Sequence, residues 1–292
     1  MDLTSSVRIE EADGIRGWAA LIVIVFHLFW EVFGILIPQF RFWPTRFFLD
    51  GPLAVYVFFI LSGDALSYRY ILTGNANILT KSIIKRYFRL TMPIVASCFI
   101  VYLLMKFGFT WNSFAGKIVH REDWLGKFIQ FPPYFGGLIR YAFIDVYIHH
   151  TLENSYNPFL WTMSIEMIGS LLVFSYLITF KHQRKPLVTA LICAGFLAYF
   201  NTFFSLFFIG IALAILRARG YFKRMHAISL TQPITLLILA GTAAIDSFAW
   251  HYKFQSMHLS IFMASIIVAM IYLNSSLDIH SSSLRHRSGG TI

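Results

Sequence analysis

The sequence predicts an all-α, polytopic membrane protein, and two observations carry this prediction. Of the 292 residues, 57% are hydrophobic and only 13% are charged, whereas about a quarter of the residues in soluble domains carry charge. The mean hydropathy is +0.65, and several apolar runs reach the roughly 20 residues that a helix needs to cross a bilayer. These runs lack the alternation of polar and apolar residues typical of a membrane β-barrel.

Eight apolar segments are predicted to span the membrane, and together they make residues 1–292 a single transmembrane domain. The fifth and sixth segments are short and are expected to form a hairpin near Asn201. The predicted spans are residues 15–37, 52–72, 90–107, 159–180, 186–200, 202–217, 230–250 and 258–274.

Three basic clusters between these segments determine the predicted orientation. They comprise Arg69, Lys81, Lys85, Arg86 and Arg89; Lys181, Arg184 and Lys185; and Arg217, Arg219, Lys223 and Arg224. With eight spans all three clusters fall on one side, which the positive-inside rule assigns to the cytoplasm, so both termini are predicted to be cytoplasmic. The net charge of +10 is therefore explained by membrane topology, and the basic residues would also suit binding of an anionic substrate. No nucleic-acid partner is expected. Cys98 and Cys193 lie inside apolar runs, so we expect neither a disulfide nor a metal site.

The longest segment between spans, residues 108–158, is predicted to lie on the outer side of the membrane, where it leaves room for a substrate. It contains HREDW, the turn signal FPPYFGG and the semi-apolar stretch RYAFIDVYIHH. Arg140 and Asp145 interrupt that stretch. We therefore predict an interfacial or re-entrant helix here rather than a further span.

The first span carries three ionisable residues that a membrane helix does not readily accommodate. Arg16 and His27 are separated by ten residues in RGWAALIVIVFHLFWE. At 100° per residue they point the same way to within about 20°, with roughly 16 Å between them along the axis. Glu31 follows His27 by four positions, which makes the two neighbours on a helix. The sequence thus predicts a polar stripe along one face of the first helix.

A histidine with a carboxylate one turn away has the chemistry of a general base, because the carboxylate orients the ring and favours the imidazolium. Two other interpretations stay open on the residues alone. His27 would also suit a hydrogen bond to a neighbouring helix, and the stripe would equally suit a proton-coupled transporter.

Polar residues also interrupt the second, third and fourth segments. In FFILSGDALSYR, Ser62 and Gly63 favour close helix packing, whereas Asp64 is a buried acid that needs a partner. In LWTMSIEM, Glu166 likewise needs a cationic or hydrogen-bonding partner. The basic run KSIIKRYFRLTMP would anchor the third helix at lipid headgroups, or hold the phosphates of a cytoplasmic donor, since arginine forks match phosphate oxygens.

Four stretches, in this order, resemble the acyltransferase 3 family of integral membrane acyltransferases. ADGIRGWAALIVIVFH is similar to the family's opening, in which an arginine and a histidine are separated by ten residues. GPLAVYVFFILSG is similar to its second helix, KRYFRLTMP to the basic entry of its third helix, and LWTMSIEM to a Leu-Trp-Thr-X-Ser-X-Glu segment. The resemblance covers roughly residues 11–170.

The resemblance implies transfer of an acyl group, often acetyl, from cytoplasmic acyl-CoA to a hydroxyl of a carbohydrate or lipid-linked glycan at the cell surface. It implies a multi-pass protein of the bacterial inner membrane, in contact with membrane lipid, with acyl-CoA as a substrate and no bound cofactor or metal. His27 would be the general base and Arg16 its companion, with Arg86 and Arg89 contacting the CoA phosphates. Further residues near the donor and the active cavity would be Ser62, Gly63, Trp161, Ser164 and Glu166.

The expected mechanism is direct: His27 takes the proton of the acceptor hydroxyl as it attacks the thioester, and Glu31 or Glu166 stabilises the imidazolium. An acyl-enzyme on Ser62 is the alternative. The family has about ten spans, so two C-terminal helices are expected to be missing from this chain. A proton-coupled transporter or flippase and an inactive, truncated relative are the alternative functions.

Overall fold

The computed structural model describes residues 10–226 and 231–287, and over these residues it contains helices and loops but no strand. The all-α prediction is therefore confirmed. Two shorter apolar helices, Pro186–Tyr199 and Phe204–Ala218, occupy the places of the predicted fifth and sixth spans. Within the described part of the chain, six helical segments are long and apolar enough to cross a membrane: Gly14–Val32, Pro44–Thr73, Ala76–Lys106, Pro158–His182, Pro233–His251 and Met257–Asn274. The number of spans that cross and the side of each terminus stay predictions.

The chain folds as two compact units. The first unit comprises the described parts of Met1–Phe26, Phe42–Gly74 and Tyr176–Ile292, and the second comprises His27–Arg41 and Asn75–Ser175. Helices of the first unit are α1 (Glu10–Val25), α2 (Trp43–Phe48), α3 (Gly51–Thr73), η6 (Phe180–His182), α9 (Pro186–Tyr199), α10 (Phe204–Ala218), α11 (Tyr221–His226), α12 (Thr231–His251) and α13 (Met257–Arg287). Helices of the second unit are most of η1 (Phe26–Val32), η2 (Pro38–Arg41), α4 (Ala76–Lys106), α5 (Asn112–Ile118), η3 (Leu125–Lys127), α6 (Phe135–Arg140), η4 (Tyr141–Asp145), α7 (Val146–Ile148), η5 (Pro158–Trp161) and most of α8 (Thr162–Thr179).

The first unit is organised around a close contact between α3 and α10. A Cβ atom on Gly63 would lie 2.2 Å from the carbonyl oxygen of Phe207, and one on Gly210 would lie 2.2 Å from that of Ile60. Because neither position has room for a side chain, glycine lets the two backbones touch, as in other membrane helix pairs. The rings of Phe59 and Phe207 stack beside this contact with their centroids 5.4 Å apart.

Replacing Gly63 by alanine is expected to destabilise the protein by about 1–3 kcal/mol, because the new methyl group would overlap a backbone oxygen that has no free direction to move. The measurement is the midpoint of thermal unfolding of the detergent-purified protein. Gly195→Ala on α9 is the matched control, since a Cβ there meets nothing within 4 Å and alanine favours a helix interior. Equal midpoints for Gly63→Ala and the wild type would show that α3 and α10 do not pack this way.

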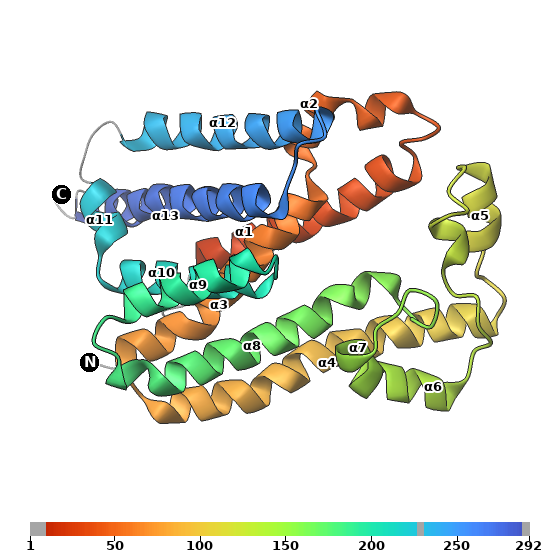
Figure 1. Ribbon diagram of the computed structural model, residues 1–292, viewed down its shortest axis with the longest axis horizontal. Helices are drawn as coiled ribbons and strands as arrows, with labels where there is room; N and C mark the ends of the chain where they lie inside the picture. Colours follow the sequence, from red (N-terminus) through yellow and green to blue (C-terminus); the bar gives the residue numbers. More distant parts are fainter. Residues whose placement is uncertain (1–9, 227–230, 288–292) are drawn as a thin grey trace. The chain divides into compact units, whose positions relative to one another are not determined.

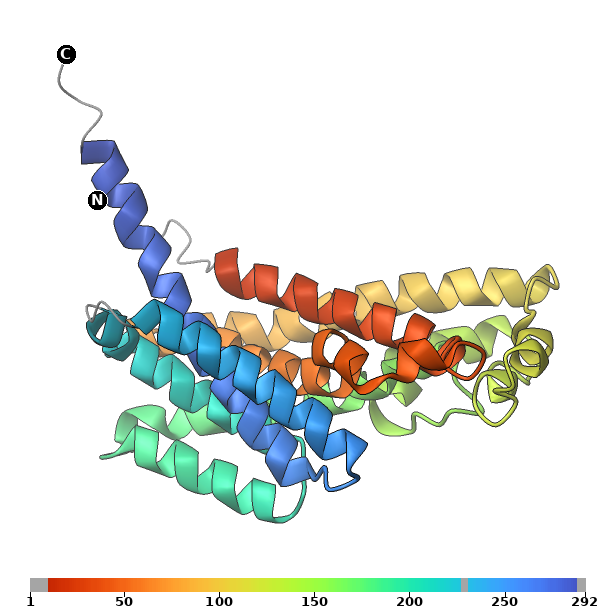
Figure 2. The same cartoon turned by 90° about the horizontal axis from the view of Figure 1, so that it is seen from above.

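The hairpin predicted near Asn201 is confirmed in the first unit. The helices α9 and α10 pack together, and they are joined by a turn in which Asn201 has a positive φ of 53°. Asparagine tolerates this left-handed conformation better than most residues do, which explains the hairpin signal. Figures 1 and 2 also show α12 beside α13, as their packing requires.

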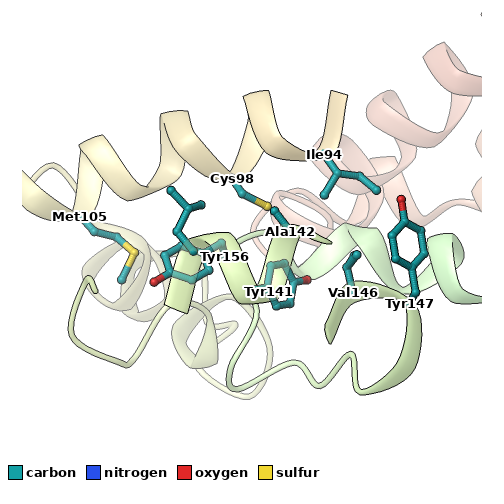
Figure 3. Close-up of a cluster of buried hydrophobic side chains, with 9 residues drawn as sticks. Ile94, Cys98, Met105, Tyr141, Ala142, Val146, Tyr147 and Tyr156 are labelled. Atoms are coloured by element: carbon teal, nitrogen blue, oxygen red, sulfur yellow. The ribbon is translucent and has the colours of Figure 1, made fainter. Parts of the chain in front are cut away.

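The second unit has its core between α4 and the helical stretch Phe135–Ile148 (Figure 3). Ile94, Cys98 and Met105 project from α4 toward Tyr141, Ala142, Val146, Tyr147 and Tyr156. The helix predicted for RYAFIDVYIHH is thus confirmed as a helix, and it is a packed element of the unit. Arg140 and Asp145, which interrupt its apolar pattern, pair with each other at 3.3 Å. Its depth in the membrane stays a prediction.

Two predicted boundaries are wrong. The third span is predicted to begin at residue 90, but the apolar helix that contains it, α4, begins at Ala76, where the Asn75 side chain accepts a hydrogen bond from the Asn77 backbone nitrogen at 3.0 Å. The basic run KSIIKRYFRLTMP therefore lies on the helix itself, because lysine and arginine are good helix formers even where they end an apolar run. The first span, expected to reach residue 37, ends as a helix at Val32.

Candidate active site

His27 and Glu31 both lie on a π-helical turn, Phe26–Val32, which follows α1. The wider turn shows in a hydrogen bond from Phe33 N to Leu28 O at 3.1 Å. The uniform helical period that predicted one polar stripe through Arg16 and His27 therefore applies only as far as Val25. Single π turns inside helices are frequent at functional sites.

Two arginines hold the end of this π turn through its backbone carbonyls. Arg41 Nε donates to Trp30 O at 3.0 Å, and Arg121 Nη1 donates to Glu31 O at 2.6 Å. Carbonyls at the end of a helix have no partner within the helix, so these side chains satisfy groups that would otherwise need water.

The imidazole of His27 is half-buried against aromatic side chains. Its ring centroid lies 4.8 Å from that of Phe159 and 5.9 Å from that of Trp124. Phe128 packs behind both rings, 4.8 Å from Trp124 and 5.9 Å from Phe159. We call Trp124, Phe128 and Phe159 the aromatic wall. Such a wall limits access of water to His27, and nearby charges act more strongly in the lower dielectric that results.

Glu31 forms its ion pairs with arginines. Its Oε2 atom lies 2.6 Å from Arg121 Nη1 and 3.9 Å from Arg41 Nη2. Glu31 is nevertheless close enough to His27 to act on it electrostatically. The proposed pairing of His27 with Glu31 thus becomes a larger cluster, in which arginines hold the carboxylate that lies near the histidine.

Sequence reasoning missed Arg121, Arg41 and the aromatic wall as neighbours of His27. Arg121 and Trp124 come from HREDW, in the segment of residues 108–158. The signal was an arginine and a tryptophan among acidic residues on the side predicted to hold the substrate. Nothing in the local sequence indicates that this stretch folds back onto residues 27–31, some 90 positions earlier in the chain.

Arg16 belongs to the first unit, whereas His27 belongs to the second. The Arg16 Nη2 atom donates to the carbonyl oxygen of Leu61 on α3 at 2.9 Å. Ser62 and Gly63 follow directly on α3, and both are buried. These predicted motif residues therefore gather where α1 and α10 pack on α3, and their contact with a donor stays a prediction.

Asp64 finds the partner that its burial requires in Arg217 of α10. Arg217 Nη2 lies 2.8 Å from Asp64 Oδ2, and the guanidinium stacks over the ring of Tyr68, 3.6 Å from its centroid. Arg217 was predicted to belong to a cytoplasmic basic cluster. In the structure its side chain is 13% exposed and joins α10 to α3 through this ion pair, and its side of the membrane stays a prediction.

Glu166 also has the cationic partner that was predicted for it. Arg86 of α4 forms an ion pair with Glu166 of α8, and its Nε atom donates to Ser170 Oγ at 2.9 Å. Arg86 is only 5% exposed, whereas Arg89 is exposed on α4. Arg86 therefore joins two helices of the second unit, and Arg89 is the better placed of the two to meet a phosphate.

Trp161 ends η5, and Ser164 lies in the first turn of α8. Trp161 is 38% exposed, and Ser164 Oγ donates to the Trp161 carbonyl oxygen at 3.0 Å. The Ser164 hydroxyl is thereby bonded back to the backbone one turn earlier. The role of both residues in a substrate cavity stays a prediction.

The first unit contains a second buried polar cluster that the sequence did not reveal. Arg46 Nε lies 2.8 Å from Asp50 Oδ2, and Asp50 Oδ1 caps α3 by accepting from Leu53 N at 2.8 Å. Gln255 donates to Asp246 Oδ1 at 3.1 Å. This cluster ties α2, α3 and α12 together.

In the second unit, Tyr141 Oη and His150 Nδ1 are 2.9 Å apart. Burial lowers the pKa of His150 and raises the pKa of Tyr141. Both groups are therefore neutral near pH 7, and the pair acts as an ordinary hydrogen bond. No group of three or more metal-ligating side chains occurs among the described residues.

Comparison with known proteins agrees with the resemblance in the sequence. The family model described as an acyltransferase domain (acyltransferase 3) matches residues 9–288. The O-acetyltransferase PaAT-1 of Phomopsis amygdali is 25% identical over 246 residues, which cover 70% of this chain and 48% of that protein. The chain thus spans about half the length of this curated relative. No solved structure matches the chain. Because the family model covers nearly the whole sequence, the chain belongs to the acyltransferase 3 family.

Proposed function

We propose that the protein is a membrane O-acyltransferase that moves an acetyl or longer acyl group from acyl-CoA to a hydroxyl of a carbohydrate or lipid-linked glycan. Family membership and the distant O-acetyltransferase support the reaction class. The observation that carries the site is the half-buried imidazole of His27, which packs against an aromatic wall and lies beside a carboxylate held by two arginines. The prediction of a bacterial inner membrane and of a cytoplasmic donor site stays part of this proposal.

In the proposed reaction, the neutral imidazole of His27 accepts the proton of the acceptor hydroxyl. At the same time the oxygen of that hydroxyl bonds to the carbonyl carbon of the thioester. The C–S bond then breaks, and the thiolate of CoA leaves with the proton that the His27 imidazolium returns. Glu31 stabilises the imidazolium that forms, because a negative charge beside a cation lowers its free energy most where water is excluded. Acyl-CoA is a substrate in this scheme, and Arg89 is proposed to contact its phosphates.

The function is tested with purified protein in nanodiscs supplied with acetyl-CoA and a panel of glycan acceptors. We expect release of free CoA thiol that depends on both protein and acceptor, with an acetylated acceptor detected by mass spectrometry. Proteoliposomes of the same preparation, loaded with a pH-sensitive dye, test the transporter alternative. Proton-coupled flux without acetylated product under any acceptor would overturn the enzyme assignment.

A further inference from the structure

We propose that Arg121 is a positioning residue that holds the turn carrying His27 and the aromatic wall in their working arrangement. This inference rests on the proposed function, because it assigns a role within the same site. Its first support is burial. The Arg121 side chain is only 10% exposed although it comes from a loop rich in charged residues, so its guanidinium is enclosed by the groups that it contacts.

The guanidinium contacts both the backbone and the side chain of one residue on the π turn. Arg121 Nη1 is 2.6 Å from Glu31 O and 2.6 Å from Glu31 Oε2. Contact with the carbonyl fixes where the turn ends, and contact with the carboxylate fixes where its charge lies. Hydrogen bonds that involve an ionised group are roughly twice as strong as neutral ones, so this double contact opposes rewinding of the turn into an ordinary α-helix.

The same guanidinium also supports the aromatic wall. Its Cζ atom lies 4.9 Å from the centroid of Trp124, and the Trp124 ring meets His27. Arg121 Nε additionally donates to Asp123 Oδ1 at 3.2 Å, which fixes the direction of the guanidinium plane. One side chain therefore connects the carboxylate beside His27 with the ring that packs on His27.

The charges of the cluster support the same role. Glu31 and Asp123 are balanced by Arg121 and Arg41, so the group around His27 has no net charge. Arg41 is the weaker partner of Glu31, because its Nη2 atom lies 3.9 Å from Glu31 Oε2 and its side chain is 34% exposed. Without Arg121, Glu31 would lose its closest partner and the loop would lose its attachment to the π turn.

The test compares Arg121→Gln, Arg121→Lys, Glu31→Gln and the double variant Arg121→Gln/Glu31→Gln. We expect Arg121→Gln to lower kcat by about 10- to 100-fold, because small displacements of a catalytic group are costly. The KM for acetyl-CoA should stay within about twofold, since Arg121 is not placed on the donor. Arg121→Lys should recover part of kcat by restoring the charge. In the Glu31→Gln background Arg121→Gln should add little, as expected for residues that act as one unit.

A readout that does not need activity keeps this inference separate from the proposed function. Diethyl pyrocarbonate modifies accessible histidines, and mass spectrometry gives its rate at His27. The rate should rise several-fold in Arg121→Gln and stay unchanged in Arg140→Gln, the matched control, whose side chain is 73% exposed in its pair with Asp145. An unchanged rate at His27 in Arg121→Gln would overturn the inference, and so would additive effects of Arg121→Gln and Glu31→Gln on kcat. Absence of acyl transfer in the wild type would instead overturn the proposed function.

Discussion

Replacing His27 by glutamine is expected to lower kcat for acyl transfer by about 10²- to 10⁴-fold, which is the usual contribution of a positioned general base. Glutamine keeps much of the size of the side chain and its hydrogen bonding, but it does not take up a proton. The thermal unfolding midpoint should therefore stay close to that of the wild type. The measurement is the initial rate of CoA thiol release with a glycan acceptor.

His149→Gln is the control for this prediction, because His149 belongs to the same unit as His27 but is exposed. Its rate should match the wild type. Full activity of His27→Gln would exclude His27 as the base and would leave only a packing role against Phe159 and Trp124.

Removing one member of the Arg86–Glu166 ion pair is expected to lower the free energy of unfolding by about 3–5 kcal/mol, because an uncompensated charge would remain buried. Arg86→Met leaves the Glu166 carboxylate buried without its cationic partner, since both side chains are almost fully enclosed between α4 and α8. The measurement is the unfolding midpoint in detergent, and poor expression of the single variant would point the same way.

The double variant Arg86→Met/Glu166→Met should recover most of that stability, since no buried charge is then left without a partner. Lys85→Gln, an exposed neighbour on α4, is the control and should melt with the wild type. The double variant also tests the predicted contact of Arg86 with CoA phosphates. A recovered midpoint with an unchanged KM for acetyl-CoA would assign Arg86 to the fold alone, whereas a raised KM would support the donor contact.

The positions of the helices were largely predictable because hydrophobicity is a local property of the chain. Each predicted apolar run corresponds to a helix, and most of their boundaries agree within a few residues. The early start of α4 was missed since charged residues end an apolar run without ending a helix. The π turn at Phe26–Val32 was missed for a related reason: the side chains that hold it come from Arg41 and Arg121, outside the turn itself.

The candidate site shows the same division. The sequence predicts that Asp64 and Glu166 each need a partner, because an isolated ionised group in an apolar segment is costly in free energy. The sequence did not predict which residue is the partner, since Arg86 lies 80 positions from Glu166 and Arg121 lies 90 positions from Glu31. Arg217, the partner of Asp64, lies on α10. Each is one of several basic residues that composition alone did not distinguish.

By itself, the sequence determined that the protein is helical and apolar, where its helices lie, and that His27, Glu31, Asp64 and Glu166 are the unusual residues among them. Family resemblance then supplied the chemistry expected of His27. Only the tertiary structure decided which cation meets which acid, and that HREDW folds back onto the turn carrying His27. The physical reason is that burial is encoded residue by residue, whereas an ion pair depends on how helices far apart in the sequence pack together.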